Sequence, residues 1–507
     1  MIRIALLILA ALLIVPVQAM AGSFANTHGF SASGISMGNA MTAVVNDWSS
    51  VYYNISGLGK TKERSTPVQA KTGSLTMSKL QNKVLAEKSS FESESTPGHI
   101  NELAITFMYT HPVLKIDIDR RMPAPDNSPL ETKAADQLNY GMMIIGVALD
   151  LNIIYKLPKF ISSARFGLGL ASPADGSATK VNDIDLRTHN WLGYGREAQV
   201  ATIIAGVGFG FLDDMFGVGA GAHIGFHGEG AVLVSNVEVG KANQNPPSQS
   251  RMDLKTVPSA VAGLYFKPGK ITPVLRGLEI GAAYRQESFM KIFPFSTGTE
   301  LKVGSSQMTL AMCIFDYYVP HTVSAGVSYT RWNATLSLDV EYQMWGLYEY
   351  SPTIEFVYND MQVQDTDDAD AWVLPKFKNI IVPKVGISYK LFDWITLMAG
   401  YSYRPSFLDD ADTGGYVNFL DNETHTGSFG TRFFIPRMGG MGGSVEITLG
   451  FQGQMLMERE VIKTGSAAAI DAAGPDAGTD NLYYSLNPDY KYGGVNYMAM
   501  LEAKLLL

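Results

Sequence analysis

Features common in soluble enzymes and nucleic-acid-binding proteins are scarce in this chain of 507 residues. It contains one cysteine, Cys313, which excludes an internal disulfide framework and a cysteine-based metal cluster. Charged residues make up 17%, below the roughly 25% of ordinary soluble domains. The formal net charge is −9, and this acidic balance argues against a nucleic-acid partner, which requires a basic surface.

Catalytic and metal-binding signatures are missing from the sequence as well. It contains no H-E-x-x-H zinc motif and no G-x-S-x-G nucleophile elbow. His223 and His227 would have metal-ligand spacing on a helix, but they lie in a glycine-rich alternating segment that predicts a strand. We therefore expect no enzymatic activity, no cofactor and no metal site.

Four aspartates gather in a long segment that predicts a loop: Asp365, Asp367, Asp368 and Asp370. They lack the glycine and the distal glutamate of an EF-hand calcium loop. Two interpretations of this cluster remain open, a solvated loop and a site where cations bridge to lipopolysaccharide phosphates.

The N-terminal sequence predicts export. A short cationic stretch ending at Arg3 precedes the aliphatic residues 4–15, and an A-x-A cleavage signal ends at Ala21. Residues 1–21 therefore indicate a secretory signal peptide. Beyond Ala21 no apolar run reaches the roughly 18 residues of a transmembrane helix. Such a chain is either a periplasmic or secreted protein or an outer-membrane β-barrel.

Alternation with a period of two favours the barrel. Over residues 334–345, Leu336 and Leu338 fall on one face and Ser337 and Asp339 on the other. This is the pattern of a strand with one apolar and one polar face. The same pattern recurs over residues 322–330, 394–404 and 444–452. These segments are longer than the strands of a soluble sandwich and long enough to cross a membrane at a tilt.

The spacing of the segments predicts about fourteen crossings, from residues 68–77 to residues 491–507. Short and long connections alternate between them, as in outer-membrane barrels, and an even count places the short turns on the periplasmic side. The long connection at residues 79–139 contains another strand-like run, residues 102–109. A hairpin within that loop and a different strand count both remain open.

Residues 22–60 do not fit a crossing strand. They are rich in glycine, serine, alanine and asparagine, with scattered aromatic residues and no alternation over a membrane-spanning length. The segment is either a periplasmic tail or a plug inside the barrel, and its size and aromatic content favour the plug.

Two runs of residues resemble a known family. Ser33 to Ala40 reads SGISMGNA, and Asn46 to Leu58 reads NDWSSVYYNISGL. Together they resemble the N-terminal hatch of the FadL/TodX-type outer-membrane transporters of hydrophobic compounds. The hatch motif is matched at Asn54, Gly57 and Leu58, whereas Ile55 and Ser56 replace a proline and an alanine of the family pattern. Residues 332–345 and 393–425 resemble barrel segments of the same family.

The resemblance implies a 14-stranded antiparallel transmembrane β-barrel plugged by an N-terminal hatch. The implied division is a signal peptide at residues 1–21, a hatch at residues 22–60 and a barrel with long extracellular loops at residues 61–507. It also implies a route from an outer groove to a site in the lumen that contacts the hatch, followed by lateral exit through the wall.

Candidate ligand-binding residues follow from the hatch and from the inward faces of the strands. The apolar part of a ligand would be lined by Phe24, Phe30, Met37, Trp48 and Trp345. Seven charged residues are expected on the lumen face: Arg285, Asp339, Glu341, Lys390, Arg404, Arg432 and Glu446. They either brace the hatch through ion pairs or hold an anionic head group, for which we name Arg404 and Arg432.

The sequence thus predicts passive transport of hydrophobic small molecules, long-chain fatty acids or hydrocarbons, across a bacterial outer membrane. The alternatives are a general porin and a surface-displayed structural or adhesin barrel that uses residues 79–139 as its display loop. The expected partners are the hydrophobic ligand, outer-membrane lipids and lipopolysaccharide. We expect no nucleic acid among the partners and a monomeric protein.

Overall fold

The computed structural model describes residues 24–61, 100–118, 139–154, 156–174, 189–191, 193–194, 201–238, 248–290, 292–303, 306–311, 317–348, 355–358, 361–363, 376–409, 418–436, 443–462 and 490–507. The predicted signal peptide (1–21), the predicted first crossing (68–77), Cys313 and the aspartate cluster at residues 365–370 lie outside this part of the chain.

Fourteen strands form one closed barrel. In order around the wall they are β1 (Glu102–Ile118), β2 (Tyr140–Asp150), β3 (Ile161–Pro173), β5 (Thr202–Phe211), β6 (Phe216–Glu238), β7 (Ser248–Phe266), β8 (Leu278–Arg285), β13 (Thr322–Arg331), β14 (Ala334–Gln343), β17 (Ile380–Phe392), β18 (Ile395–Arg404), β20 (Thr424–Ile435), β21 (Ser444–Val461) and β22 (Tyr490–Leu506). Each strand pairs antiparallel with the next, and β22 pairs with β1. The predicted 14-stranded antiparallel barrel is confirmed.

The first wall strand differs from the prediction. It is β1, which starts at Glu102 and pairs with β22 along its whole length, from Glu102 opposite Leu506 to Ile118 opposite Tyr490. The barrel therefore closes at fourteen strands without residues 68–77. The strand-like run at residues 102–109 is the beginning of this crossing, because its alternation continues to Ile118.

The two faces of the wall alternate as the sequence predicts. On β14, Leu338 and Val340 point outward and are 53% and 50% exposed, whereas Asp339 and Glu341 point into the lumen and are buried. On β22, Leu501 faces outward and its neighbour Glu502 is buried inside. An apolar outer face around a polar lumen is the arrangement of an outer-membrane β-barrel.

The barrel has two unlike ends. Short turns join β2 to β3, β5 to β6, β7 to β8, β13 to β14 and β17 to β18; this end is called the short-turn end here. Those turns contain the 3₁₀ helices η3 (Leu151–Ile153), η5 (Pro268–Lys270) and η6 (Pro273–Leu275). The longer connections lie at the long-loop end, with η7 (Trp345–Leu347), β4 (Asn190–Trp191), β9 (Ser288–Met290), β12 (Tyr317–Val319) and β19 (Phe419–Leu420).

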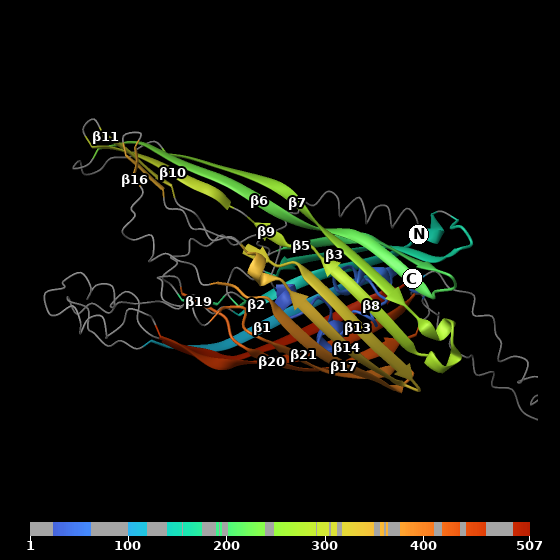
Figure 1. Ribbon diagram of the computed structural model, residues 1–507. Helices are drawn as coiled ribbons and strands as arrows, with labels where there is room; N and C mark the ends of the chain where they lie inside the picture. The colour runs from blue at the N-terminus through green and yellow to red at the C-terminus, as the bar shows by residue number, and fades with distance from the viewer. Residues whose placement is uncertain are drawn as a thin grey trace, which may run out of the picture.

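Two wall strands continue beyond the barrel. β6 and β7 form a ribbon that β10 (Ile292–Val303) joins by parallel pairing with β6. β11 (Ser306–Ala311), β15 (Glu355–Tyr358) and β16 (Met361–Val363) extend this sheet. Figure 1 shows the extension at the upper left, at the end of the barrel away from the short turns.

Residues 24–61 lie inside the barrel, where Figure 1 shows the blue segment enclosed by the wall. The segment contains the short helices α2 (Phe24–Thr27), α3 (Ala32–Ser36) and α4 (Ser50–Tyr53) and the 3₁₀ helix η1 (Ile55–Gly59). Ser31 caps α3 by accepting a hydrogen bond from the Gly34 amide. Each of these helices is only four or five residues long, and helices this short are marginal by themselves, so the segment depends on the wall for its conformation.

Gly38 shows how closely segment and wall approach. Its φ is +62°, a left-handed conformation that favours glycine, and a Cβ atom there would lie 2.6 Å from the backbone nitrogen of Tyr401. Its amide donates to the Ser428 hydroxyl on β20. A side chain at this position would push the segment away from β18.

Among the described residues, no helix is long and apolar enough to cross a membrane.

Substitutions on the outer face test the barrel and its position in a bilayer. We expect Leu338→Arg, near the middle of β14, to lower the free energy of unfolding by roughly 2–4 kcal/mol, because a charge then faces the middle of the lipid. Tyr329→Arg, near the short-turn end of β13, should cost less. The measurement is urea unfolding in lipid vesicles, followed by the different gel mobilities of folded and boiled protein. Equal costs, or a helical circular dichroism spectrum, would contradict the barrel.

Candidate ligand site in the barrel lumen

An aromatic cluster fills the middle of the lumen. Ring centroids lie 6.1 Å apart for Phe24 and Phe30, 5.7 Å for Phe30 and Trp48, and 5.1 Å for Phe30 and Tyr52. Phe24, Phe30 and Trp48 have no exposed surface. Around them pack wall residues that are small or flexible: Ala104, Met108, Met142, Ile144, Ala148, Met398, Met498 and Met500. These residues form an apolar patch of the otherwise polar inner wall against the aromatic cluster.

Three of the predicted ligand residues are thus brought together, Phe24, Phe30 and Trp48. Trp48 lies directly on the wall at Gly146, where a Cβ atom would come within 2.0 Å of the indole ring. Met37 belongs to the same buried cluster and its backbone oxygen packs on Gly386. Gly169 lies against Phe30 in the same way, so glycines at these two wall positions let the aromatic rings approach the strands closely.

Trp345 lies elsewhere, in a second cluster at the long-loop end. Its ring stacks on Phe407 at 3.9 Å between centroids, with an interplanar angle of 8°. The rest of this cluster consists of Phe377, Ile380, Val382, Leu408 and Phe419. It joins the connection between β14 and β17, and the start of β17, to the connection between β18 and β20. The structure therefore places the predicted ligand residues in two separate apolar clusters.

The two predicted head-group arginines lie at opposite ends of the lumen. Arg404 is at the long-loop end of β18 and forms an ion pair with Asp421 at 2.6 Å. Its guanidinium also lies 5.6 Å from the centre of the Phe407 ring, beside the cluster that contains Trp345. Arg432 is near the short-turn end of β20 and donates to the Ser33 hydroxyl at 2.6 Å. Their role in ligand binding stays a prediction.

The hatch motif forms a turn that is bonded to the wall. The side-chain amide of Asn54 donates to the carbonyls of Thr42 at 2.7 Å and Leu264 at 3.0 Å. Its oxygen accepts from the amide and the hydroxyl of Ser56. Leu58 is fully buried. The serine that replaces the family's alanine thus takes part in the turn through a hydrogen bond.

The η1 helix rests on a wall of glycines. At Gly59 an added Cβ would lie 2.4 Å from the carbonyl carbon of Phe209, and at Gly208 it would lie 2.7 Å from the Ile55 oxygen. Backbone therefore packs on backbone along β5 and β6. This explains the glycine-rich stretches of these strands, which complete no nucleotide-binding pattern in the sequence.

Arg165 on β3 is the main polar anchor of the segment. It is buried, and its guanidinium donates to the backbone oxygens of Leu58 at 2.6 Å, Asn46 at 2.9 Å, Lys60 at 3.0 Å and Gly57 at 3.1 Å. It also pairs with Glu102 on β1 at 3.2 Å. One planar side chain thereby satisfies carbonyls that would otherwise be buried without partners.

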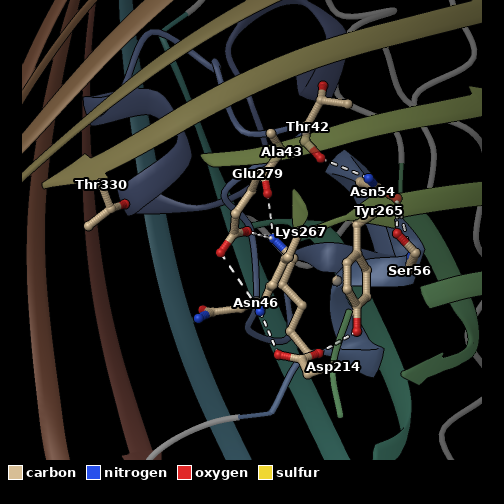
Figure 2. Close-up of polar contacts among 12 residues, drawn as sticks. Thr42, Ala43, Asn46, Asn54, Ser56, Asp214, Tyr265, Lys267, Glu279 and Thr330 are labelled. Atoms are coloured by element: carbon tan, nitrogen blue, oxygen red, sulfur yellow. Dashed lines mark hydrogen bonds and ion pairs between the residues drawn. The ribbon is translucent and has the colours of Figure 1, made fainter. Parts of the chain in front are cut away.

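Lys60 makes a second anchor near the short-turn end. Its ammonium donates to the Ala43 carbonyl and pairs with Glu279 on β8 at 2.6 Å. Beside it, Lys267 pairs with Asp214 at 2.5 Å and the Tyr265 hydroxyl donates to the same carboxylate. Figure 2 shows Asp214 between Tyr265 and Lys267, with Glu279 pointing toward Lys267. Burial lowers the pKa of Lys60, and the Glu279 carboxylate opposes that effect.

Other lumen charges also bind the N-terminal segment. Lys504 pairs with Asp47 at 3.0 Å and with Glu446 at 2.7 Å. The Asp339 carboxylate accepts from the Thr42 amide at 2.6 Å. These contacts match the bracing interpretation of the lumen charges.

Lys390 is an exception to the expected lumen charges. It lies at the mouth of the barrel, is half-exposed and pairs with Asp393 in the turn after β17. Its ion-pair partner lies in that turn and not in residues 24–61.

A small polar pocket lies between the segment and the wall at β8, β13, β14 and β17. It is lined by Ala25, Asn26, Asn39, Thr42, Tyr52, Tyr53, Arg285, Ser324, Glu341 and Lys384. Glu341 pairs with Lys384 at 2.9 Å and with Arg285 at 3.5 Å, and Arg285 donates to the Tyr52 carbonyl. On this side, the segment and the wall are less tightly packed than at the glycines of β5 and β6.

Sequence reasoning missed Arg165, Lys60 and Asp47 as anchors. Arg165 occupies an inward-facing position in the alternation of β3, and that position could have identified it as a lumen residue. Their partners could not be read from the chain, because Arg165 reaches backbone oxygens more than one hundred residues away. Within the described residues, no group of three or more histidine, cysteine or acidic side chains could hold a metal ion.

Comparisons with known proteins found no family model and no curated protein that matches the chain. Solved structures with a similar fold include a Pseudomonas aeruginosa FadL homologue, with 13% identity, coverage of 94% of this chain and 98% of that chain, and a TM-score of 0.49. The P. putida toluene transporter TodX has 12% identity, 95% and 99% coverage and a TM-score of 0.46. The Ralstonia pickettii toluene transporter TbuX has 10% identity, coverage of 94% of this chain and 98% of that chain, and a TM-score of 0.43.

The chain is similar to FadL- and TodX-type channels. At these identities and TM-scores the similarity does not establish what the chain transports, and the inference about function depends on the lumen itself.

Arg165→Lys tests the main anchor. A lysine keeps the charge but cannot donate to several backbone oxygens at once as the planar guanidinium does. The binding of residues 24–61 to the wall should therefore weaken by roughly 1–3 kcal/mol while the wall still folds. We expect higher basal conductance in planar bilayers and faster proteolysis within the segment. Arg331→Lys, at an exposed arginine in the β13–β14 turn, is the matched control. Wild-type conductance and proteolysis in Arg165→Lys would contradict the anchoring role.

We expect His28 to make the packing of residues 24–61 against the barrel wall depend on pH. Its ring nitrogen Nε2 lies 3.2 Å from the Tyr140 hydroxyl, and burial lowers the pKa of His28 from 6.5 to about 4, partly opposed by a hydrogen bond with Gln452. A lowered pKa means that the neutral ring stabilises the seated segment above pH 6.5, and that this contribution is lost as the pH falls toward 4. Acidification from pH 7 to 4.5 should therefore raise conductance more in wild type than in His28→Gln. An equal acid response in both proteins would count against this role.

Proposed function

We propose that the protein is a passive outer-membrane transporter of hydrophobic small molecules. The observation that carries the proposal is the apolar aromatic cluster in the lumen, where Phe24, Phe30 and Trp48 pack on methionine, alanine and isoleucine of the wall. A general diffusion channel has a polar, water-filled interior instead.

An apolar interior offers a hydrophobic solute what a water-filled pore does not. Removing apolar surface from water contributes about 25 cal/mol per Å², so the solute can leave water within the barrel. Methionine side chains adapt to irregular shapes, and Met108, Met142 and Met500 line the cluster. The site would therefore accept apolar molecules of differing shape.

Passage requires part of the segment to move. Residues 54–61 are fixed by Arg165, by the Lys60–Glu279 ion pair and by the glycine wall. Residues 24–36 contact the wall through apolar packing, neutral hydrogen bonds such as Gln454 to Thr27, and the hydrogen bond from Arg432 to Ser33. The N-terminal part of the segment is thus the part that moves when a ligand passes. Residues 22–60 then act as a hatch in a barrel formed by the rest of the mature chain.

The aromatic cluster around Trp345 supports a first contact at the long-loop end. Arg404 lies beside Phe407 and Trp345, so a cation and an apolar surface adjoin there. An amphiphile with an anionic head group would meet both. In this proposal, long-chain fatty acids use Arg404, and neutral hydrocarbons use only the apolar surfaces.

The alternatives fit the lumen less well. A general porin would need an open passage, but residues 24–61 occupy the lumen and are bonded to the wall on several sides. A display barrel would need residues 79–139 as one long surface loop. The middle of that stretch is instead β1, a strand of the barrel wall.

Aromatic-to-serine variants test the proposal. Phe24→Ser combined with Phe30→Ser should weaken binding of fatty acids and of toluene-like hydrocarbons about tenfold or more, because each removes apolar contact. Arg404→Ala should weaken only carboxylated ligands, by roughly tenfold. Quenching of tryptophan fluorescence and uptake into proteoliposomes are the measurements.

Phe392→Ser, at an exposed aromatic residue near the short-turn end, is the matched control. Gel mobility verifies that every variant is folded. Unchanged binding in the Phe24 and Phe30 variant would remove the lumen cluster from the transport route.

A further inference from the structure

Three neighbouring turns form a continuous surface at the short-turn end, called the shelf here: residues 151–154 with 156–160, residues 212–215 and residues 267–277. The Leu212 amide donates to the Phe160 carbonyl at 3.4 Å, which joins the first two turns. The Lys267 amide donates to the Met215 carbonyl at 2.7 Å, which joins the second and third. The three turns therefore hold one another in place.

The shelf exposes large apolar side chains. Ile154 is 79% exposed, Ile271 is 65% exposed and Val274 is 85% exposed. Phe160 and Leu212 add to the same surface. Apolar patches of this kind mark interaction sites.

Basic side chains stand among these apolar residues. Lys156, Lys159, Lys270 and Arg276 are exposed. The exposed acidic side chain of these turns, Asp213, is paired with Lys270 at 3.0 Å. The shelf is therefore positively charged on a protein whose net charge is −9.

The shelf continues the outer face of the wall. Val218, Leu264 and Ile280 are exposed on β6, β7 and β8, directly next to these turns. A bilayer that covers those strands meets the shelf at its head-group level. Basic residues at that level attract anionic head groups, each contributing about 1 kcal/mol.

We infer that the shelf binds anionic phospholipid. The ammonium groups of Lys156 and Lys159 contact the head-group phosphate, and Ile154, Ile271 and Val274 insert at the boundary between head groups and acyl chains. Continuity with the lipid-facing wall selects a lipid over a protein partner, and the positive charge selects an anionic lipid over a zwitterionic one. This inference goes beyond the transport function and needs only the membrane barrel.

Lipid retention by the full-length barrel tests the inference. Native mass spectrometry of the detergent-purified protein would compare phosphatidylglycerol with phosphatidylcholine of the same acyl chains. We expect the wild type to retain phosphatidylglycerol preferentially. Lys156→Ala combined with Lys159→Ala should weaken that binding about fivefold for each lysine removed, with phosphatidylcholine unaffected. Ile154→Ser combined with Val274→Ser should reduce retention of both lipids.

Lys376→Ala combined with Lys378→Ala, two exposed lysines at the long-loop end, is the matched control and should bind as wild type does. Equal retention of both lipids by the wild type, or an equal loss in the control, would overturn the inference. So would a dimer, detected by light scattering, that the Lys156 and Lys159 variant loses, since a second copy would then be the occupant. Cross-links from the shelf to an envelope protein, without any preference for phosphatidylglycerol, would also overturn it.

Discussion

Closure of β22 onto β1 is the constraint on which the rest of this structure depends. A strand edge in lipid leaves backbone amide and carbonyl groups without water or partners, at several kcal/mol each, so a membrane-spanning sheet must close. The pairing runs the full length of β1, from Glu102 to Ile118. Closure also creates the lumen, and with it the question of how polar side chains turned away from lipid are satisfied.

The N-terminal segment supplies partners for many of these inward-facing polar side chains. Arg165, Asp339 and Lys504 face inward from the wall, and each finds its partner in residues 42–60. Buried charges are tolerated only when they are paired and hydrogen-bonded, so wall and segment stabilise each other. The anchoring is uneven. Charged contacts gather where the segment leaves the lumen, and apolar contacts gather at its start. In the proposed function, this uneven anchoring is what lets the start of the segment move while its end stays fixed.

The short-turn end joins the inner and outer surfaces of the barrel. Asp214 and Lys267 belong to the turns between β5 and β6 and between β7 and β8, and on their inner side they adjoin Lys60. The same turns expose Leu212, Ile271 and Val274 on the outside. The same two turns therefore contact the anchored part of the segment on their inner side and form the shelf on their outer side. Their packing stabilises both.

Alternation along the chain was enough to determine the wall, because lipid on one side and the lumen on the other impose a period of two on every crossing. The sequence alone determined the inward face of β14 and β22 and the short and long connections, whereas its count of about fourteen crossings left a different strand number open. The prediction placed the first crossing at residues 68–77 and left residues 102–109 as an additional strand-like run, because only pairing with β22 selects β1. The sequence also could not show that Trp345 lies apart from Phe24 and Phe30, or that Arg404 and Arg432 sit at opposite ends. Those relations depend on distances between residues that are remote in the chain, and only the closed barrel, with its segment seated inside, decides them.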